Sequence, residues 1–217
     1  MITVHSIPGS PFGRAVLATC VEKGAPHRFV AVAPPTLKGP EHTARHPFGR
    51  VPAIDDDGFK LYETQAITRY LDAAYGAPRA LTPRDPKVEA RMNQVIGVID
   101  WYFFAPNSAM TLGFNRVVAP KLGFPVNEEA VTASLPQTKY CIEVLAGFLE
   151  SSPYMAGDVF SLADIHAGTQ FDLLSSAPEA VEMLKGTPIP SWLGRLAARP
   201  SFATTTWERV AELAAAA

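Results

Sequence analysis

A serine stands near the start of the chain between a short β-branched stretch and a helical pattern, in HSIPGSPFGRAVL at residues 5–17. Pro11 suits the first position of a helix, so Ser10 could simply cap that helix. The same helix end gathers unpaired N–H groups and the positive end of the helix dipole, which together stabilise an anion such as a thiolate. Position alone favours the cap over the thiolate-stabilising role. Ser6, at the end of a strand, is a weaker candidate for chemistry.

Two later segments could bind a ligand. In FGRVPA, at residues 48–53, Pro52 stands at the start of a strand, which fits an edge position or a cis Val51–Pro52 bond. Glu63 and Thr64 then end a strand and open a helix. They could serve the helix start through capping and the dipole, or they could hold a ligand carboxylate together with backbone N–H groups. Each segment alone favours the structural role.

Histidine and basic residues between these segments offer weaker signals. His42 and His46 are four residues apart and could share a metal on a helix, but HTARH lacks the glutamate of zinc hydrolase motifs and no further ligand is near in sequence. We therefore expect no metal site. The basic side chains are either solvated charges or partners of a carboxylate, and they are Lys38, Arg45 and Arg50.

The residues up to 76 predict a scaffold of mixed strands and helices. Strands are expected at 2–5 and 28–32 and on both sides of the Asp57-Gly58 turn, and helices over 12–23 and after Glu63. The resulting βαβ-ββα order predicts one parallel strand pair with a crossover helix and an antiparallel hairpin. This arrangement would place Ser10, which follows the first strand, and Val51–Pro52, which precede the hairpin, on the same scaffold.

Strand patterns vanish after a proline-rich segment at 77–86, which predicts a linker. Helices are expected from Asp85, from Asn127 and from the Ser161–Asp164 capping box, and Pro136 predicts a kink or a late helix start. We therefore predict an α/β domain at 1–76 and an all-helical domain at 87–217.

Composition narrows the class of protein. The 217 residues are 47% hydrophobic and 18% charged with a net charge of −2, so no basic footprint for nucleic acid is present. Cys20 and Cys141 are far apart in sequence and lie in apolar helical patterns, which is typical of free thiols in a reducing compartment. The chain start does not look like a signal peptide, and the most apolar stretch is too short to cross a membrane. We expect a cytoplasmic protein.

In combination, four segments resemble the cytosolic glutathione S-transferase family, most closely its phi-type and related bacterial members. They are PGSPFGRAVL, HPFGRVPAI, LYETQAITRYL and YMAGDVFSLADIH, and their order and spacing extend the resemblance over nearly the whole chain. The resemblance implies a thioredoxin-like N-terminal domain that binds glutathione and an all-α C-terminal domain. It also implies a homodimer, glutathione as co-substrate and no permanently bound cofactor.

The resemblance also assigns roles to residues. The Ser10 hydroxyl would hydrogen-bond the glutathione sulfur, Val51 before a cis Pro52 would pair with the cysteinyl backbone, and Glu63 with Thr64 would hold the γ-glutamyl group. The full set of expected glutathione contacts is Phe12, Lys38, Arg50, Val51, Pro52, Glu63 and Thr64. Thr64 departs from the usual serine, keeping the hydroxyl and adding a methyl group.

An apolar pocket for the second substrate would come from aromatic residues, although aromatic side chains at helical spacing are more often plain core. The candidates are Phe12, Tyr102, Phe103 and Phe114. Asp100 and Phe48 could act across a dimer. The expected reaction is attack of the glutathione thiolate on a small hydrophobic electrophile. The same site would suit a glutathione-dependent isomerase, dehalogenase or peroxidase, and the fold would suit a non-catalytic binding or assembly protein.

Overall fold

The computed structural model describes residues 1–76 and 80–215 and divides the chain into two compact units. The first unit contains residues 1–82 together with 197–217, and the second contains 83–196. A mixed sheet lies in the first unit, and the second is built from helices. The predicted combination of a thioredoxin-like domain and an all-helical domain is confirmed.

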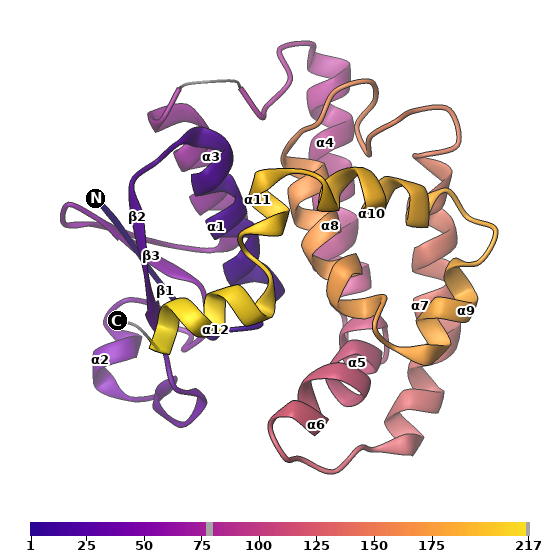
Figure 1. Cartoon of the computed structure of the whole chain (residues 1–217), viewed down its shortest axis with the longest axis horizontal. Coiled ribbons are helices and arrows are strands. Elements are labelled where there is room, and N and C mark those ends of the chain that lie inside the picture. The colour runs from indigo at the N-terminus through magenta and orange to yellow at the C-terminus, as the bar shows by residue number, and fades with distance from the viewer. Residues whose placement is uncertain (77–79, 216–217) are drawn as a thin grey trace. The chain divides into compact units, whose positions relative to one another are not determined.

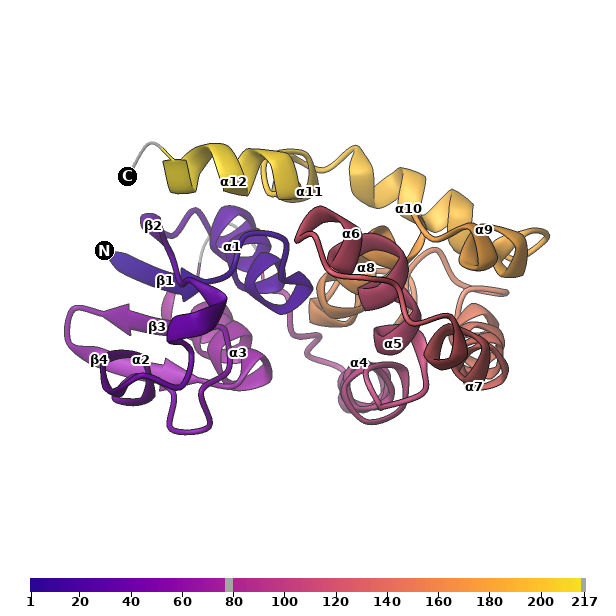
Figure 2. The same cartoon turned by 90° about the horizontal axis from the view of Figure 1, so that it is seen from below.

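The first unit contains a four-stranded sheet (Figure 1), and its strand order is β2-β1-β3-β4 (Figure 2). β1 and β2 are parallel, while β3 is antiparallel to both β1 and β4, as the βαβ-ββα order predicts. The elements in chain order are β1 (Ile2–Ser6), α1 (Pro11–Lys23), β2 (His27–Ala31), η1 (Pro34–Thr36), α2 (Pro40–Thr43), β3 (Ala53–Asp56), β4 (Phe59–Tyr62), α3 (Thr64–Ala74), α11 (Pro200–Ala203) and α12 (Trp207–Ala215).

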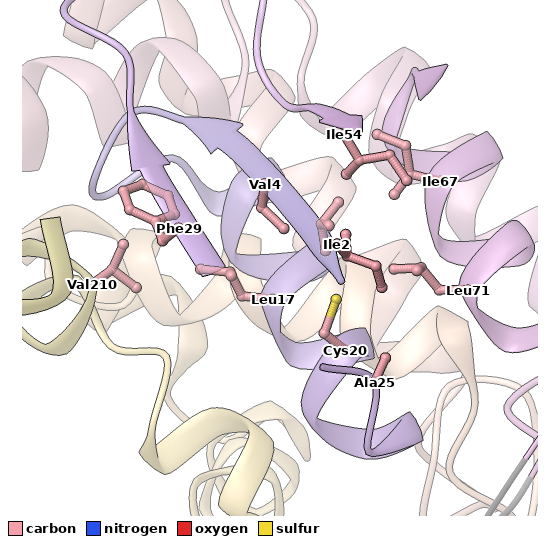
Figure 3. Packing of buried hydrophobic residues seen from close by; sticks show 11 residues of the cluster. Ile2, Val4, Leu17, Cys20, Ala25, Phe29, Ile54, Ile67, Leu71 and Val210 are labelled. Carbon is pink, nitrogen blue, oxygen red and sulfur yellow. The ribbon is translucent and has the colours of Figure 1, made fainter. Parts of the chain in front are cut away.

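One face of this sheet forms a hydrophobic core with helices α1 and α3 (Figure 3). Alternate residues of β1, Ile2 and Val4, are fully buried in it, because successive strand side chains point to opposite faces. Helix α12 contributes Val210, which is 4% exposed. The remaining buried members are Val16, Leu17, Cys20, Ala25, Phe29, Ile54, Ile67 and Leu71. This core fixes the N-terminal ends of α1 and α3 relative to the sheet.

The C-terminal segment is fastened to helix α1 (Figure 2). The Arg14 guanidinium donates to the carbonyl of Phe202 at 3.2 Å, and Arg199 forms a bidentate ion pair with Glu22 at 2.8 and 2.7 Å. Ser201 also donates to Glu22. The sequence places 197–217 with the helical domain, whereas these bonds and the burial of α12 pack the segment onto the first unit.

The segment predicted as a linker is anchored at its centre. Leu81 is 2% exposed, and the backbone N–H groups of Leu81 and Thr82 each donate to the Asp72 carboxylate at 2.8 Å. Lys23 donates to the same carboxylate at 2.8 Å in a buried ion pair. Burial alone would raise the pKa of Asp72, but these hydrogen bonds hold it below its ordinary value. Residues 77–79 of the predicted linker lie outside the described residues.

The second unit consists of helices and the loops that join them, the longest of which runs from α7 to α8. Its elements are α4 (Pro86–Val98), the π-helical turns η2 (Ile99–Phe103) and η3 (Phe114–Val118), α5 (Ala109–Gly113), α6 (Ala119–Lys121), α7 (Glu128–Gly147), α8 (Leu162–Leu174), α9 (Pro178–Leu184) and α10 (Ile189–Ala197). Helix α7 starts at the Asn127 cap and continues through Pro136, so the alternative of a late helix start is wrong. Within the part of the chain that is described, no helix is long and apolar enough to span a bilayer.

A buried carboxylate organises the start of helix α8. Ser161 and Asp164 form the predicted capping box, with both reciprocal hydrogen bonds present. The Asp164 carboxylate also accepts from the Met155 backbone N–H and from the indole of Trp192, both at 2.9 Å. Because Asp164 is fully buried, these donors replace the water it loses on folding. The capping box therefore links α8 to the preceding loop and to α10.

Candidate glutathione site

Ser10 is the N-cap of helix α1. Its backbone is extended, with φ −67° and ψ 119°, and Pro11 is the first helical residue. The Ser10 Oγ accepts from the backbone N–H of Gly13 at 3.2 Å, so the capping role is confirmed. This bond occupies a lone pair and leaves the hydroxyl hydrogen available for donation. Capping and donation to a bound anion are therefore compatible in the same side chain.

Ser6 lies behind the helix rather than at its exposed end. Its side chain is fully buried, and its Oγ has no hydrogen-bond partner among the described residues. A Cβ built on Gly13 would lie only 2.1 Å from this oxygen, which shows how closely helix α1 approaches the strand. Because Ser6 is enclosed in this way, it cannot reach a substrate. Ser10, which is half-buried, is the serine that can.

The loop before β3 contains a cis peptide bond between Val51 and Pro52. Val51 is half-buried and Pro52 is buried, and β3 begins at the next residue. The carbonyl of Arg50 lies 2.7 Å from Nε2 of His42, and since a carbonyl only accepts, that nitrogen donates. The loop therefore holds the backbone of Val51 in a defined position at the end of the sheet.

The basic residues of the predicted site surround the same loop. Lys38 is exposed and its ammonium donates to the carbonyl of Phe48 at 2.6 Å, while the Arg50 side chain is exposed. An ammonium has three donors, so Lys38 keeps two for other partners. Gly49 has φ +58°, and a Cβ there would lie 2.6 Å from the Leu37 carbonyl oxygen, so only glycine fits this close approach.

The backbone conformation of Glu63 is a feature that the sequence does not reveal. It is the N-cap of α3 with φ 71° and ψ 115°, and its side chain makes no capping hydrogen bond, so a capping role for this side chain is wrong. A non-glycine residue at positive φ costs about 1–3 kcal/mol, and such residues gather at ligand sites. The exposed Glu63 carboxylate is thus presented at the helix start, next to the buried Thr64. The residue type alone does not predict this conformation.

The two histidines pack inside the α2 region. The rings of His42 and His46 are stacked with centroids 6.4 Å apart, and the His46 ring lies 4.8 Å from that of Tyr62. Burial lowers the pKa of His46. No cluster of three or more His, Cys, Asp or Glu side chains able to hold a metal occurs within residues 1–76 and 80–215. In the structure the His42 side chain hydrogen-bonds the backbone of the loop before Pro52.

The predicted aromatic pocket residues separate into two groups. Phe103 is 2% exposed and its ring packs 4.9 Å from that of Phe171, so it belongs to the core of the second unit and offers no surface to a ligand. This corrects its assignment to the pocket. Tyr102 and Phe114 are 59% and 43% exposed on the π-helical turns, and Phe12 is half-buried in the first turn of α1. Tyr102 and Phe114 thus keep ring surface outside the core of the second unit, and Phe12 is partly exposed in the first unit.

The chemistry available in the first unit suits an extended anionic peptide. Ser10 supplies a hydroxyl donor at a helix N-terminus, the backbone at Val51 can pair with another backbone, and Glu63 can bind an amine. Lys38 and Arg50 can bind a carboxylate. A thioredoxin-like domain with these groups, followed in the chain by an all-helical domain, defines the class of glutathione-dependent transferases and their relatives.

Comparison with known proteins shows which family of this class the chain belongs to. The glutathione S-transferase N-terminal domain model matches residues 4–79, and the C-terminal domain model matches residues 97–200. A probable glutathione S-transferase from Oryza sativa subsp. japonica is 31% identical over 191 residues, covering 86% of each chain. Glutathione transferase F7 from Populus trichocarpa has a TM-score of 0.83 at 25% identity, covering 99% of both chains. Glutathione S-transferase I from maize, in complex with an atrazine glutathione conjugate, has a TM-score of 0.80 at 26% identity and covers 99% of this chain and 98% of its own.

The chain therefore belongs to the glutathione S-transferase family, among phi-type relatives, and is an enzyme of that family.

Proposed function

We propose that this enzyme conjugates the thiolate of glutathione to a small hydrophobic electrophile, with Ser10 stabilising the thiolate. The observation that carries the proposal is the geometry of Ser10. Its oxygen caps α1 through the Gly13 N–H and its hydroxyl hydrogen remains for the sulfur. A donor aimed at the thiolate lowers the pKa of the thiol and so raises the fraction of the reactive form at neutral pH. The protein forms no covalent bond to the substrate in this reaction.

The rest of the tripeptide would be bound by the loops beside Ser10. The Val51 backbone pairs with the cysteinyl residue, and the Glu63 carboxylate binds the γ-glutamyl amine. Thr64, at the first turn of α3, donates to the γ-glutamyl carboxylate. Lys38 and Arg50 bind the glycine carboxylate, and Lys38 can do so while it still holds the Phe48 carbonyl. The positive φ of Glu63 supports its role, because backbone strain of this kind is retained at ligand sites.

The electrophile would contact exposed aromatic side chains. Tyr102 and Phe114 keep most of their ring surface outside the core and Phe12 keeps part of its ring exposed, unlike Phe103. The maize relative of known structure is in complex with an atrazine glutathione conjugate. That likeness supports an apolar second substrate and a role in detoxification as part of the proposal.

Retention on immobilised glutathione and conjugation of a chlorinated nitroaromatic compound test the proposal. The wild type should be retained and active, and Ser10→Ala should be retained but much slower. No retention of the wild type would contradict glutathione as its co-substrate. Retention without conjugation would direct the search to isomerase, dehalogenase and peroxidase substrates at the same site. A Ser10→Ala variant with full activity would remove Ser10 as the thiolate donor.

We also propose that the enzyme is a cytoplasmic homodimer. Phe48 and Trp101 are 64% and 77% exposed, and large aromatic rings in contact with water gain free energy when a partner covers them. Sedimentation of the wild type and of Phe48→Ser measures this. A single species with the mass of two chains supports the dimer, and a wild type with the 23.4 kDa mass of one chain contradicts it.

A further inference from the structure

The backbone of Gly9, immediately before Ser10, lies against the indole ring of Trp207. Gly9 has φ +86°, and a Cβ built on it would lie 2.4–2.6 Å from three atoms of that ring. Three nearly equal distances mean that the side-chain direction of Gly9 points into the flat face of the indole. Gly9 and Trp207 are separated by almost the whole chain. Because Trp207 is the first residue of α12, this helix begins directly on the loop that presents Ser10.

The segment that carries Trp207 is held on both of its sides. Before it, Arg14 donates to the carbonyl of Phe202 at 3.2 Å and to the hydroxyl of Thr205 at 3.4 Å. After it, Val210 is 4% exposed in the core beneath β2. Because Arg14 belongs to the first turns of α1, the indole is fixed against the same helix that Ser10 caps. The ring therefore has little freedom to leave Gly9.

We propose that Trp207 is a positioning residue for catalysis: its indole supports the loop at Gly9 and so sets the direction in which Ser10 presents its hydroxyl to the glutathione sulfur. The inference rests on the proposed function, since it concerns the donor of that site. Hydrogen bonds weaken steeply when the donor angle or distance departs from its optimum. A glycine that is free to change its conformation next to Ser10 would allow such departures, and the flat ring prevents them.

Variants of Trp207 test this role through the pKa of bound glutathione. Trp207→Ala removes the ring, Trp207→Leu keeps apolar volume without a flat face, and Trp207→Phe keeps a flat face. Arg209→Ala is the matched control, because Arg209 is on the same helix with a side chain that is 65% exposed. The measurements are the ultraviolet absorbance of the bound thiolate and the pH profile of kcat/KM, with the unfolding temperature and the Kd of glutathione recorded alongside.

The apparent pKa of bound glutathione should rise by about one unit in Trp207→Ala and Trp207→Leu, which is a tenfold smaller thiolate fraction below that pKa. It should stay near the wild-type value in Trp207→Phe and Arg209→Ala, and the Kd should change little because Ser10 is one contact of many. Trp207→Leu decides the question if Trp207→Ala does not fold.

Unchanged pH profiles in Trp207→Ala and Trp207→Leu, even with a lower unfolding temperature, would show that Trp207 acts on stability alone and would overturn the inference. A wild-type protein that does not bind glutathione would instead overturn the proposed function, and the positioning role with it. The two failures are separated by the Kd of the wild type.

Discussion

Replacing Ser10 with aspartate separates the two tasks of this side chain. Aspartate caps helices as well as serine does, so it can accept from the Gly13 N–H in the same way. A carboxylate has no hydrogen to donate, and its charge repels a thiolate. Ser10→Asp should therefore fold with wild-type stability and lose conjugation. Ser10→Ala removes the cap and the donor together and should fail in both respects.

The expected sizes follow from the geometry. A serine cap contributes roughly 1 kcal/mol, and the 3.2 Å bond in a half-buried site is longer than the usual 2.9–3.0 Å, so Ser10→Ala should cost about 0.5–1 kcal/mol of unfolding free energy. In a chain of this size such a loss lowers Tm by about 1–4 °C. A hydrogen bond to a charged group contributes about 1.5–3 kcal/mol, so kcat/KM below the thiol pKa should fall roughly 10- to 150-fold.

Urea unfolding and the pH profile of kcat/KM measure the two effects separately in the wild type, Ser10→Ala and Ser10→Asp. Two results would refute the reasoning. Conjugation by Ser10→Asp at the wild-type rate would show that no donor is needed at this position. Equal stability of Ser10→Ala and the wild type would show that the Gly13 bond contributes nothing to the helix.

Three further predictions concern stability. Lys23→Met leaves the buried Asp72 carboxylate without its cation and should cost about 3 kcal/mol in urea unfolding, whereas the exposed pair at Lys185 should tolerate Lys185→Met with little change; equal losses would contradict this. Asp164→Ala strands several buried donors and should cost at least about 3 kcal/mol; a variant that unfolds at the wild-type urea concentration would show that the capping box is dispensable. Burial, aided by a nearby arginine, lowers the pKa of His5 to about 4. Between about pH 6.5 and pH 4 the unfolded chain therefore binds a proton that the folded protein does not, so the stability should fall by at most about 3 kcal/mol as the pH drops through this range. His5→Gln should flatten this part of the stability profile.

Sequence patterns predicted the scaffold well wherever local physics decides the structure. The end of α1 is an example: Gly24 follows the last apolar position and adopts the left-handed conformation that glycine favours, with φ 60°. The capping box at Ser161 and Asp164 is another, because both of its hydrogen bonds form within four residues of chain. The Ser10 cap was predictable for the same reason.

Features that depend on distant contacts were not predictable. Glu63 adopts positive φ at the junction of β4 and α3, although its residue type gives no sign of it. The aromatic pattern of η2 could not separate the exposed Tyr102 from Phe103, which is buried against Phe171. Likewise Pro136 lies inside α7, where tertiary packing outweighs the cost of one missing backbone hydrogen bond.

The return of the C-terminal segment to the first unit has a consequence for synthesis. A ribosome releases the sheet and α1 early, but Arg199, which pairs with Glu22, and Val210, which belongs to the same core as Leu17 and Phe29, emerge only after the second unit has been made. Until then the nascent sheet exposes apolar surface that a chaperone or a neighbouring chain could bind. The thioredoxin-like unit therefore begins to fold before the second unit is made and completes its core after it. A premature stop codon just before residue 197 would leave that core open, although the second unit would still be made in full.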